Sequence, residues 1–220
     1  MAYSTEKGIF ISFEGIDGSG KSTQMAIAAK YIRGKGFDVI TTREPGGTKL
    51  AEKIRDILLD NALGGRVTPM AELLLYLASR HQHSEETIVP HLNSGSVVLT
   101  DRYADSSTAY QGGGRGLGLD LVEGLNELVI PRWPDLTIII DVPIEIGLSR
   151  MGNRRPDRLE EEGTNFLKAV RAAYLEIAGR HTERIVVVDG SGNIEKTSAQ
   201  VIFTIERFLA GINRIGISGG

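Results

Sequence analysis

The chain has 220 residues, 41% of them hydrophobic and 24% charged, which is typical of a globular protein and suits one sizeable α/β domain. Its formal net charge of −3 provides no overall basic field for a nucleic-acid polymer, so any anionic ligand must meet a local cluster of positive side chains. The absence of cysteine excludes disulfides, thiolate catalysis and cysteine-based metal sites.

Five short β-branched runs recur along the chain, each followed by a longer stretch compatible with a helix. They predict strands at residues 9–13, 38–42, 96–100, 137–142 and 184–189. The helices are predicted at residues 21–34, 48–60, 69–92, 119–128, 143–151, 160–180 and 193–212. We expect a doubly wound, five-stranded parallel sheet with helices on both faces, forming a single domain over residues 1–220. Ligands should bind where the strands end.

The stretch GIDGSGKSTQ, residues 15–24, follows the first predicted strand and fits the phosphate-loop spacing G-x-x-x-x-G-K-[ST]. Its glycines let backbone N–H groups turn toward a phosphate, and Lys21 places a positive charge near the β- and γ-phosphates. The Ser22 hydroxyl can bind Mg²⁺, and a helix beginning at Lys21 adds the positive end of its dipole. The stretch therefore predicts a nucleotide-phosphate site.

Two aspartates end strands and could both hold Mg²⁺ beside this loop, namely Asp101 after the third strand and Asp141 after the fourth. We favour Asp101 because the residues after Asp141 are apolar, whereas polar side chains able to bind a second ligand follow Asp101. These side chains are Arg102, Ser106, Tyr110 and Gln111.

Two further features can be interpreted in two ways. Arg43, in the stretch TREPGG, either lies solvated in a turn or binds a phosphate bidentately at a strand end. Tyr76 and Arg80 are four residues apart on a predicted helix, where they either pack in the core or stack on a base and hydrogen-bond its edge.

The stretch RMGNRRPDRLEEEG contains four arginines, at 150, 154, 155 and 158. Such a cluster is either solvated surface or a cationic lid, at about residues 150–160, that closes over the phosphate loop and excludes water. An arginine that neutralises charge during phosphoryl transfer can contribute roughly 10³ to 10⁵ in rate.

With these motifs in place, the chain resembles the thymidylate kinase family of P-loop nucleoside monophosphate kinases. The resemblance runs from about residue 8 to 212, and the stretches EGIDGSGKSTQ, TREPGG, DRYADSSTAYQGGGRG and RRPDRLE carry it. It implies transfer of the γ-phosphoryl group of ATP to dTMP, giving dTDP, with Mg²⁺ as the metal ion.

The resemblance also implies roles by position. ATP would be bound by Gly15, Ile16, Asp17, Gly18, Ser19, Gly20, Lys21, Ser22 and Thr23, with Arg150 and Gly190 flanking the adenine. The dTMP site would comprise Asp17, Arg43, Tyr76, Arg80, Arg102, Ser106, Tyr110 and Gln111, with Tyr76 in place of the family's usual stacking phenylalanine. The catalytic residues would be Asp17, Lys21, Arg102, Arg154 and Arg155, and the metal ligands Ser22 and Asp101.

Some family members carry an arginine inside the phosphate loop, whereas others, typically bacterial, place it in the lid. With Gly18 in the loop and arginines at 154 and 155, this chain resembles the second kind, and the choice between Arg154 and Arg155 stays open. Family members are commonly homodimers, and the apolar run at 71–78 is compatible with that.

Neither a membrane-spanning run nor a secretory signal is evident, so we expect a cytoplasmic enzyme with no membrane or nucleic-acid partner. Two other functions remain as alternatives. One is a P-loop kinase acting on another nucleotide or nucleoside. The other is a nucleotide-hydrolysing switch, although the N-K-x-D element expected of a guanine switch is absent from the sequence.

Overall fold

The computed structural model describes residues 8–63, 65–152, 158–159 and 162–217. Its sheet consists of β1 (Ile9–Glu14), β2 (Val39–Arg43), β3 (Val97–Asp101), β4 (Leu136–Asp141) and β5 (Ile185–Asp189). The strands lie in the order β2-β3-β1-β4-β5, and every pairing is parallel. The five-stranded parallel sheet predicted from the sequence is confirmed.

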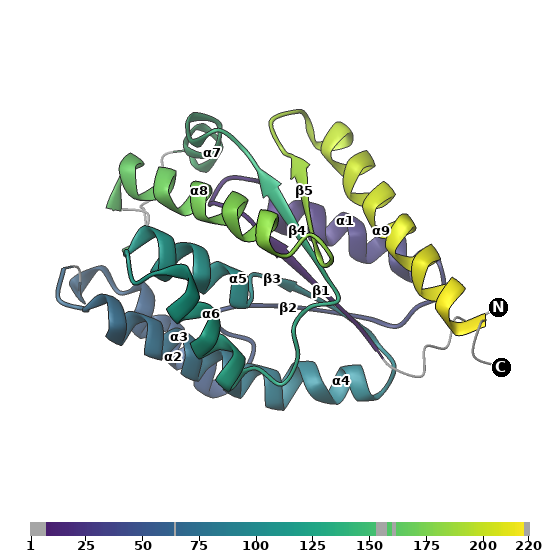
Figure 1. Cartoon of the computed structure of the whole chain (residues 1–220), viewed down its shortest axis with the longest axis horizontal. Helices are drawn as coiled ribbons and strands as arrows, with labels where there is room; N and C mark the ends of the chain where they lie inside the picture. The colour runs from purple at the N-terminus through teal and green to yellow at the C-terminus, as the bar shows by residue number, and fades with distance from the viewer. Residues whose placement is uncertain (1–7, 64, 153–157, 160–161, 218–220) are drawn as a thin grey trace.

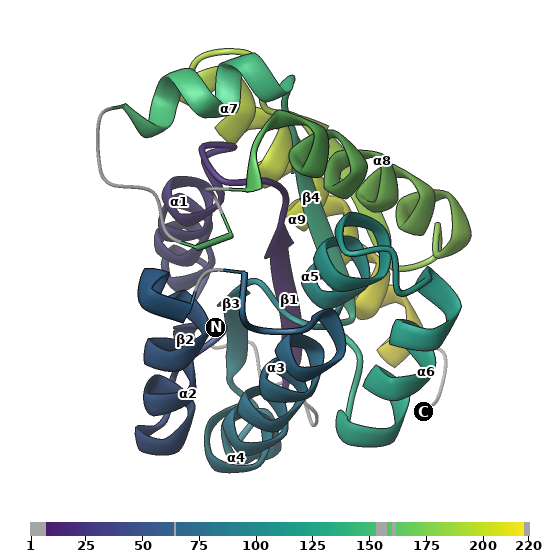
Figure 2. The same cartoon turned by 90° about the vertical axis from the view of Figure 1, so that its left-hand side faces the viewer.

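Helices cover both faces of this sheet (Figures 1 and 2). The α-helices are α1 (Lys21–Gly34), α2 (Lys49–Leu59), α3 (Pro69–His83), α4 (Val89–Asn93), α5 (Ala104–Ser107), α6 (Leu119–Val129), α7 (Ile144–Met151), α8 (Thr164–Arg180) and α9 (Ile194–Ile217). A short 3₁₀ helix, η1 (Asn61–Leu63), and two π-helical segments, η2 (Ser84–Ile88) and η3 (Thr108–Gly114), complete the described elements. Within those residues, no helix is long and apolar enough to cross a membrane.

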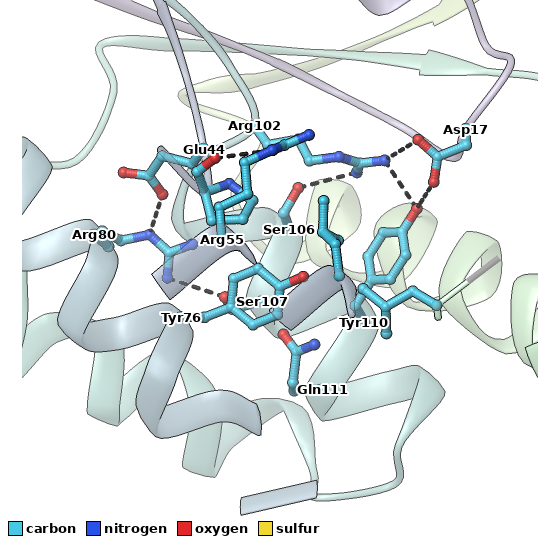
Figure 3. A pocket seen from close by; sticks show the side chains of 13 residues that line it. Asp17, Glu44, Arg55, Tyr76, Arg80, Arg102, Ser106, Ser107, Tyr110 and Gln111 are labelled. Carbon is cyan, nitrogen blue, oxygen red and sulfur yellow. Dashed lines mark hydrogen bonds and ion pairs between the residues drawn. The ribbon is translucent and has the colours of Figure 1, made fainter. Parts of the chain in front are cut away.

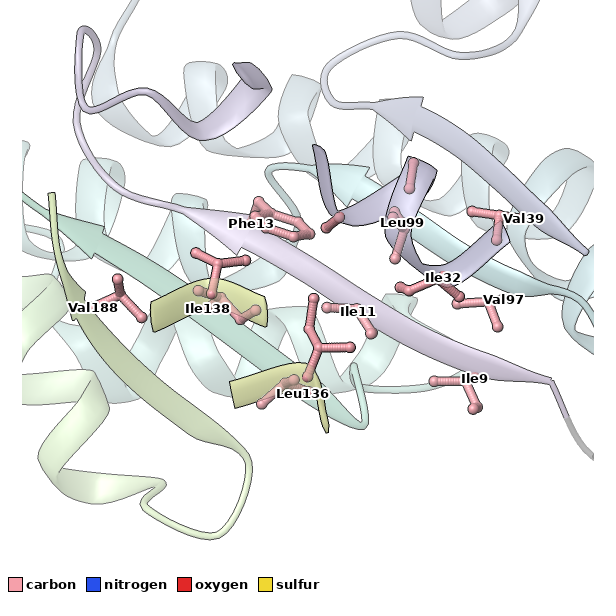
Figure 4. Close-up of a cluster of buried hydrophobic side chains, with 14 of the residues drawn as sticks. Ile9, Ile11, Phe13, Ile32, Val39, Val97, Leu99, Leu136, Ile138 and Val188 are labelled. Atoms are coloured by element: carbon pink, nitrogen blue, oxygen red, sulfur yellow. The ribbon is translucent and has the colours of Figure 1, made fainter. Parts of the chain in front are cut away.

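Alternation along the strands decides which helices pack on which face, because successive side chains point to opposite sides of a sheet. Ile11 and Phe13 of β1 face α1 and α9, where they join Ile32 and Ile205 in one buried cluster (Figure 4). Phe10, the residue before Ile11, belongs to a cluster on the other face with residues of α4 and α5. Both faces are therefore buried, which explains why the strands read as continuous apolar runs.

The register brings the carboxyl ends of three strands together. Phe13 of β1 lies opposite Asp101 of β3, which in turn lies opposite Arg43 of β2. The loops that follow these strands therefore leave the sheet at the same edge. This arrangement places the phosphate-loop motif beside the polar segment that begins at Asp101.

Residues 69–92 do not form the single helix predicted for them. The helix ends at His83, continues as the π-helical η2, and resumes as α4. Pro90 lies in the first turn of α4 and has no backbone N–H, so it cannot donate a hydrogen bond to the preceding turn. The π-helical segment η2 lies directly before the turn in which Pro90 lacks this donor.

The polar segment after β3 is helical, although no helix was predicted there. Residues 104–107 form α5, and the chain then widens into η3. Short polar residues and glycines hide the helical periodicity there. The glycines have a packing reason, since a Cβ at Gly113 would lie 2.4 Å from the Cβ of Ala173 on α8.

Candidate active site

The phosphate loop connects β1 to α1. Gly20, the residue before α1, has φ 96°, and the structure gives the helix no side-chain cap, so its first backbone N–H groups point to the loop without a capping acceptor. Gly18 has φ 76°, and a Cβ there would lie 2.1 Å from the carbonyl oxygen of Gly147 on α7. The loop therefore approaches α7 more closely than any other residue at position 18 would allow.

Lys21 lies inside this loop. Its Nζ donates a hydrogen bond to the carbonyl oxygen of Ile16 at 3.0 Å and lies 3.9 Å from Oδ1 of Asp17. Burial lowers the pKa of Lys21, and the charge of Arg102 lowers it further, although Asp17 opposes both. The negative phosphates of a bound nucleotide would stabilise the charged form of the Lys21 ammonium group.

The residues proposed for Mg²⁺ lie together. The Ser22 hydroxyl donates a hydrogen bond to Oδ2 of Asp101, so the two side-chain oxygens predicted to hold the ion, from α1 and β3, meet at the loop. A hydroxyl and one carboxylate suit Mg²⁺, which prefers oxygen ligands and completes its octahedron with waters and phosphate oxygens. The rival, Asp141, instead binds Arg171 through both carboxylate oxygens at 2.6 and 2.8 Å.

A hollow extends from the phosphate loop toward the loop after β5. The predicted ATP-site residues that line it are Gly18, Ser19, Gly20, Thr23, Arg150 and Gly190. Arg150 donates hydrogen bonds to the carbonyl oxygens of Gly190 and Gly192, each at 2.9 Å, which fixes its side chain at one end of the hollow. Gly15 and Ile16 do not line it; they connect β1 to the loop, and Ile16 is buried in the core.

A second pocket, with a cavity volume of about 90 Å³, lies on the other side of Asp17 (Figure 3). Seven of the eight predicted dTMP-site residues line it, namely Asp17, Tyr76, Arg80, Arg102, Ser106, Tyr110 and Gln111. The lining residues that were not predicted are Glu44, Pro45, Arg55, Leu59, Ser107 and Leu159. The structure thus brings together side chains from β1's loop, α2, α3 and the segment after β3.

Arg102 lies where the two cavities meet. Among the described residues it is the only non-glycine with a positive φ, at 73°. Its guanidinium donates to Oδ1 of Asp17 at 2.7 Å, to the Tyr110 hydroxyl at 3.0 Å and to the carbonyl oxygen of Gly15 at 3.0 Å. Burial alone would lower the pKa of Arg102, but the charge of Asp17 raises it well above its usual value, so the side chain stays cationic.

Asp17 is the counter-charge in this arrangement. Its Oδ1 accepts from Arg102 and its Oδ2 accepts from the Tyr110 hydroxyl at 3.2 Å. Although burial favours the protonated acid, the charges of Arg102 and Lys21 hold the pKa of Asp17 well below its usual range. An ionised carboxylate therefore lies between two cations at the junction of the cavities.

Glu14, which was not among the predicted site residues, lies beneath the same junction and is fully buried. Its carboxylate accepts from Ser106 Oγ at 2.5 Å and from the Tyr174 hydroxyl at 2.9 Å, and both groups also contact Nη1 of Arg102 at 3.3 Å. Burial and the charge of Asp105 raise the pKa of Glu14 to about 7. Its position at the carboxyl end of a predicted strand could have marked Glu14 as a site residue. Its partners Ser106 and Tyr174 are distant in sequence, so no local pattern pointed to them.

At the opposite end of the pocket, Tyr76 and Arg80 share one face of α3, as predicted. Arg80 is only 1% exposed. Its Nε donates to Glu44 at 2.8 Å, its Nη1 to Ser107 at 3.0 Å and Asn126 at 2.8 Å, and its Nη2 to the carbonyl oxygen of Tyr103 at 3.0 Å. These bonds occupy four of the five N–H donors of a guanidinium and leave one for a ligand.

Arg43 is not brought to the pocket. Its Nη2 bonds Glu52 at 2.9 Å, its side chain is 48% exposed, and it is absent from the described residues that line the cavity. Arg55 lines the pocket instead, donating to the carbonyl oxygen of Pro45 at 2.9 Å. No motif marked Arg55, because it approaches the pocket only through the packing of α2 against α3.

The two predicted lid arginines, Arg154 and Arg155, lie outside the described residues. Arg158 lies within them, and the solvated interpretation is wrong for it. It is 3% exposed, donates from Nε to the carbonyl oxygen of Leu58 at 2.9 Å and pairs with Glu72 at 2.7 Å. Arg158, near the end of the predicted lid segment, thus packs on α2 and α3.

A phosphate loop at the end of β1, facing an arginine-containing pocket across Asp17, defines a P-loop kinase. Comparisons with known proteins give the family. The family model described as thymidylate kinase matches residues 13–201. A thymidylate kinase of Thermosipho africanus (strain TCF52B) is 46% identical over 91% of this chain and 99% of its own length.

Further relatives agree. A thymidylate kinase of Geobacter sp. (strain M21) is 45% identical over 96% of this chain and 97% of its own. The crystal structure of the Ehrlichia chaffeensis thymidylate kinase superposes with a TM-score of 0.74, at 35% identity, over 91% of this chain and 99% of that one. The chain belongs to the thymidylate kinase family.

Proposed function

We propose that this chain transfers the γ-phosphoryl group of ATP to dTMP, giving ADP and dTDP for dTTP synthesis. Family membership supports the reaction. One observation supports the site: Asp17 and Arg102 line the acceptor pocket while the adjoining Gly18 lines the phosphate-loop hollow, so two phosphate-binding regions meet end to end.

On the donor side, the N–H groups at the start of α1 and the Lys21 ammonium bind the β- and γ-phosphates. Ser22 and Asp101 would hold Mg²⁺, directly or through water. When bound, this ion neutralises phosphate charge. The hollow that Arg150 and Gly190 line receives the adenine.

On the acceptor side, Arg102 binds the phosphate of dTMP, and Asp17 keeps its guanidinium oriented. An oxygen of that phosphate attacks the γ-phosphorus in line while the bond to the β-phosphate oxygen breaks, and ADP leaves. A phosphate monoester is already anionic near neutral pH, so the step needs no general base. Positioning and charge neutralisation carry the catalysis. The side chain of Arg43 is exposed. Its predicted contact with the dTMP phosphate is part of this proposal.

The base end of the pocket binds thymine. The Tyr76 ring packs on the base, and the remaining N–H of Arg80 donates to its edge, beside Tyr110 and Gln111 (Figure 3).

We also propose a single kinase domain over residues 1–220, with a lid at about 150–160 that supplies Arg154 or Arg155. We further propose that the chain forms a homodimer and is located in the cytoplasm.

One coupled assay for ADP, run over a panel of acceptors, tests the reaction. We expect ADP release to require dTMP and to exceed that with dUMP at least tenfold. Release without any acceptor would contradict a kinase and favour a nucleotide-hydrolysing switch. A preference for another nucleotide or for a nucleoside would instead assign a different substrate to the same site.

A further inference from the structure

A second buried carboxylate, Glu72 in the first turn of α3, lies behind the base end of the pocket without lining it. It accepts a hydrogen bond from Nε2 of Gln111 at 2.9 Å. It also accepts from Nε and Nη2 of Arg115 at 3.2 and 3.1 Å, and it pairs with Nη1 of Arg158 at 2.7 Å. Two guanidinium groups therefore compensate the charge of Glu72, and the Gln111 amide is its third hydrogen-bonding partner.

Glu72 is an acceptor only. Burial by itself would favour the protonated acid, but the hydrogen bonds from Arg115 and Gln111 hold the pKa of Glu72 below its usual value. An ionised carboxylate cannot donate, so it dictates the orientation of the amide that faces it. Gln111 must turn its NH₂ group toward Glu72 and its oxygen away.

The oxygen of that amide is left for a ligand. Gln111 lines the pocket, and Figure 3 shows its amide beside the ring of Tyr76. In the part of the chain that the structure describes, no hydrogen bond to this oxygen is found, and it is not among the buried side-chain atoms without a partner. The pocket thus presents one fixed acceptor, in the same cavity that Arg80 lines.

Pyrimidines differ at the edge that such groups would contact. Thymine and uracil carry a donor at N3–H beside a carbonyl acceptor at C4. Cytosine carries an acceptor at N3 beside an amino donor. A freely rotating amide can serve either base by exchanging its oxygen and nitrogen. Here the exchange would place the amide oxygen against the Glu72 carboxylate, where two acceptors repel each other.

We infer that Glu72 is a positioning residue for specificity: it fixes the Gln111 amide with its oxygen toward the base and so restricts the pocket to pyrimidines that carry an N3–H. This inference rests on the proposed function. Glu72 touches no substrate and acts through Gln111 alone.

The test compares kcat/KM for dTMP, dUMP and dCMP between the wild-type chain and Glu72→Gln. A glutamine at position 72 can accept or donate, so Gln111 regains its second orientation. We expect the dTMP-to-dCMP ratio of kcat/KM to fall at least tenfold, and the dTMP-to-dUMP ratio to stay unchanged because both bases carry N3–H. General damage to the fold would lower all three values together and leave both ratios unaltered.

Glu162→Gln is the matched control. Glu162 also pairs with Arg115, at 2.6 Å, but has no recorded bond to Gln111 within the described residues, so the variant should retain the wild-type ratios. If Glu72→Gln fails to fold, Gln111→Met decides, because it keeps the pairs of Glu72 with both arginines and removes only the amide. It should lower kcat/KM for dTMP at least tenfold while that for dCMP does not fall.

An unchanged dTMP-to-dCMP ratio in a folded Glu72→Gln, or in Gln111→Met where that variant decides, would overturn the inference. A wild-type chain that does not phosphorylate dTMP would overturn the proposed function instead.

Discussion

Arg102 illustrates how a single residue is adapted to its place between the phosphate loop and the adjoining pocket. Its positive φ directs the side chain back under the phosphate loop, where it bonds Gly15, Asp17 and Tyr110. A left-handed conformation costs a non-glycine residue on the order of 1 kcal/mol or more, and such strain persists only where surrounding contacts enforce it. The five side-chain hydrogen bonds of Arg102 to described residues provide that enforcement.

Glu14 gives a prediction about stability and pH. Its pKa in the folded protein is about 7, against an ordinary value of 4.5. Between these two values the folded state binds more protons than the unfolded state, so rising pH lowers the free energy of unfolding. The loss is complete above pH 7 and amounts to about 3 kcal/mol. Glu14→Gln cannot ionise and should lack this loss.

The measurement is urea unfolding at pH 5 and pH 8. The stability of the wild-type chain relative to Glu14→Gln should fall as pH rises through this window. Glu127→Gln, which replaces an exposed carboxylate on α6, is the control and should run parallel to the wild type. Parallel curves for Glu14→Gln as well would show that Glu14 titrates normally.

At the scale of elements, the phosphate loop depends on its contact with α7. Gly18→Ala combines a positive φ with a Cβ placed 2.1 Å from the carbonyl oxygen of Gly147. We expect a loss of about 1–3 kcal/mol in stability and a rise of at least tenfold in the KM for ATP, because the loop must move away from α7.

Thermal unfolding and steady-state kinetics provide the two readouts. Gly116→Ala is the matched control: its φ of 73° is similar, and a Cβ there meets no atom within 4 Å. It should show the backbone cost without the kinetic effect. Equal KM values for ATP in both variants would mean that the approach of the loop to α7 does not shape the ATP site.

The predicted lid carries its own test. Because a lid arginine would act on charge that develops during transfer, Arg154→Ala or Arg155→Ala should lower kcat by orders of magnitude while dTMP binding stays nearly intact. Single-turnover kinetics and calorimetric titration with dTMP separate the two effects. Normal turnover in both single variants and in the double variant would refute the lid role.

At the scale of the molecule, α2, α3 and α6 lie side by side on one flank (Figures 1 and 2). Large apolar side chains are exposed there, including Leu50 at 49%, Leu74 at 54% and Leu128 at 81%. Such a surface favours burial against a second copy. The apolar run at 71–78 is thus only partly used by the core of the single chain.

Sedimentation of the wild-type chain should therefore show a dimer, and Leu74→Glu should shift the equilibrium at least tenfold toward the monomer, because a charge would be desolvated at the interface. Phe203→Glu, which changes an apolar residue of α9 that is 60% exposed, should leave the dimer intact. A monomeric wild type, or a dimer insensitive to Leu74→Glu, would remove this proposal.

The sequence by itself determined the sheet, the phosphate loop and the edge at which the strand-end loops lie together. Strand and loop signals are local: contiguous β-branched runs, glycine spacing and a lysine before the helix define backbone geometry within a few residues. The proximity of Ser22 and Asp101 also followed, because a parallel sheet brings the carboxyl ends of its strands to one edge.

Only the tertiary structure decided which side chains face each other across distant elements. Arg55 rather than Arg43 lines the pocket, Arg80 is bound by Glu44, and Glu72 receives Gln111 and Arg158. In each pair the partners are dozens of residues apart, and no sequence period encodes their separation. The packing of α2, α3 and η3 sets those distances. Hydrogen bonds form only over a narrow range of donor–acceptor distances and angles, and this requirement then selects the partners.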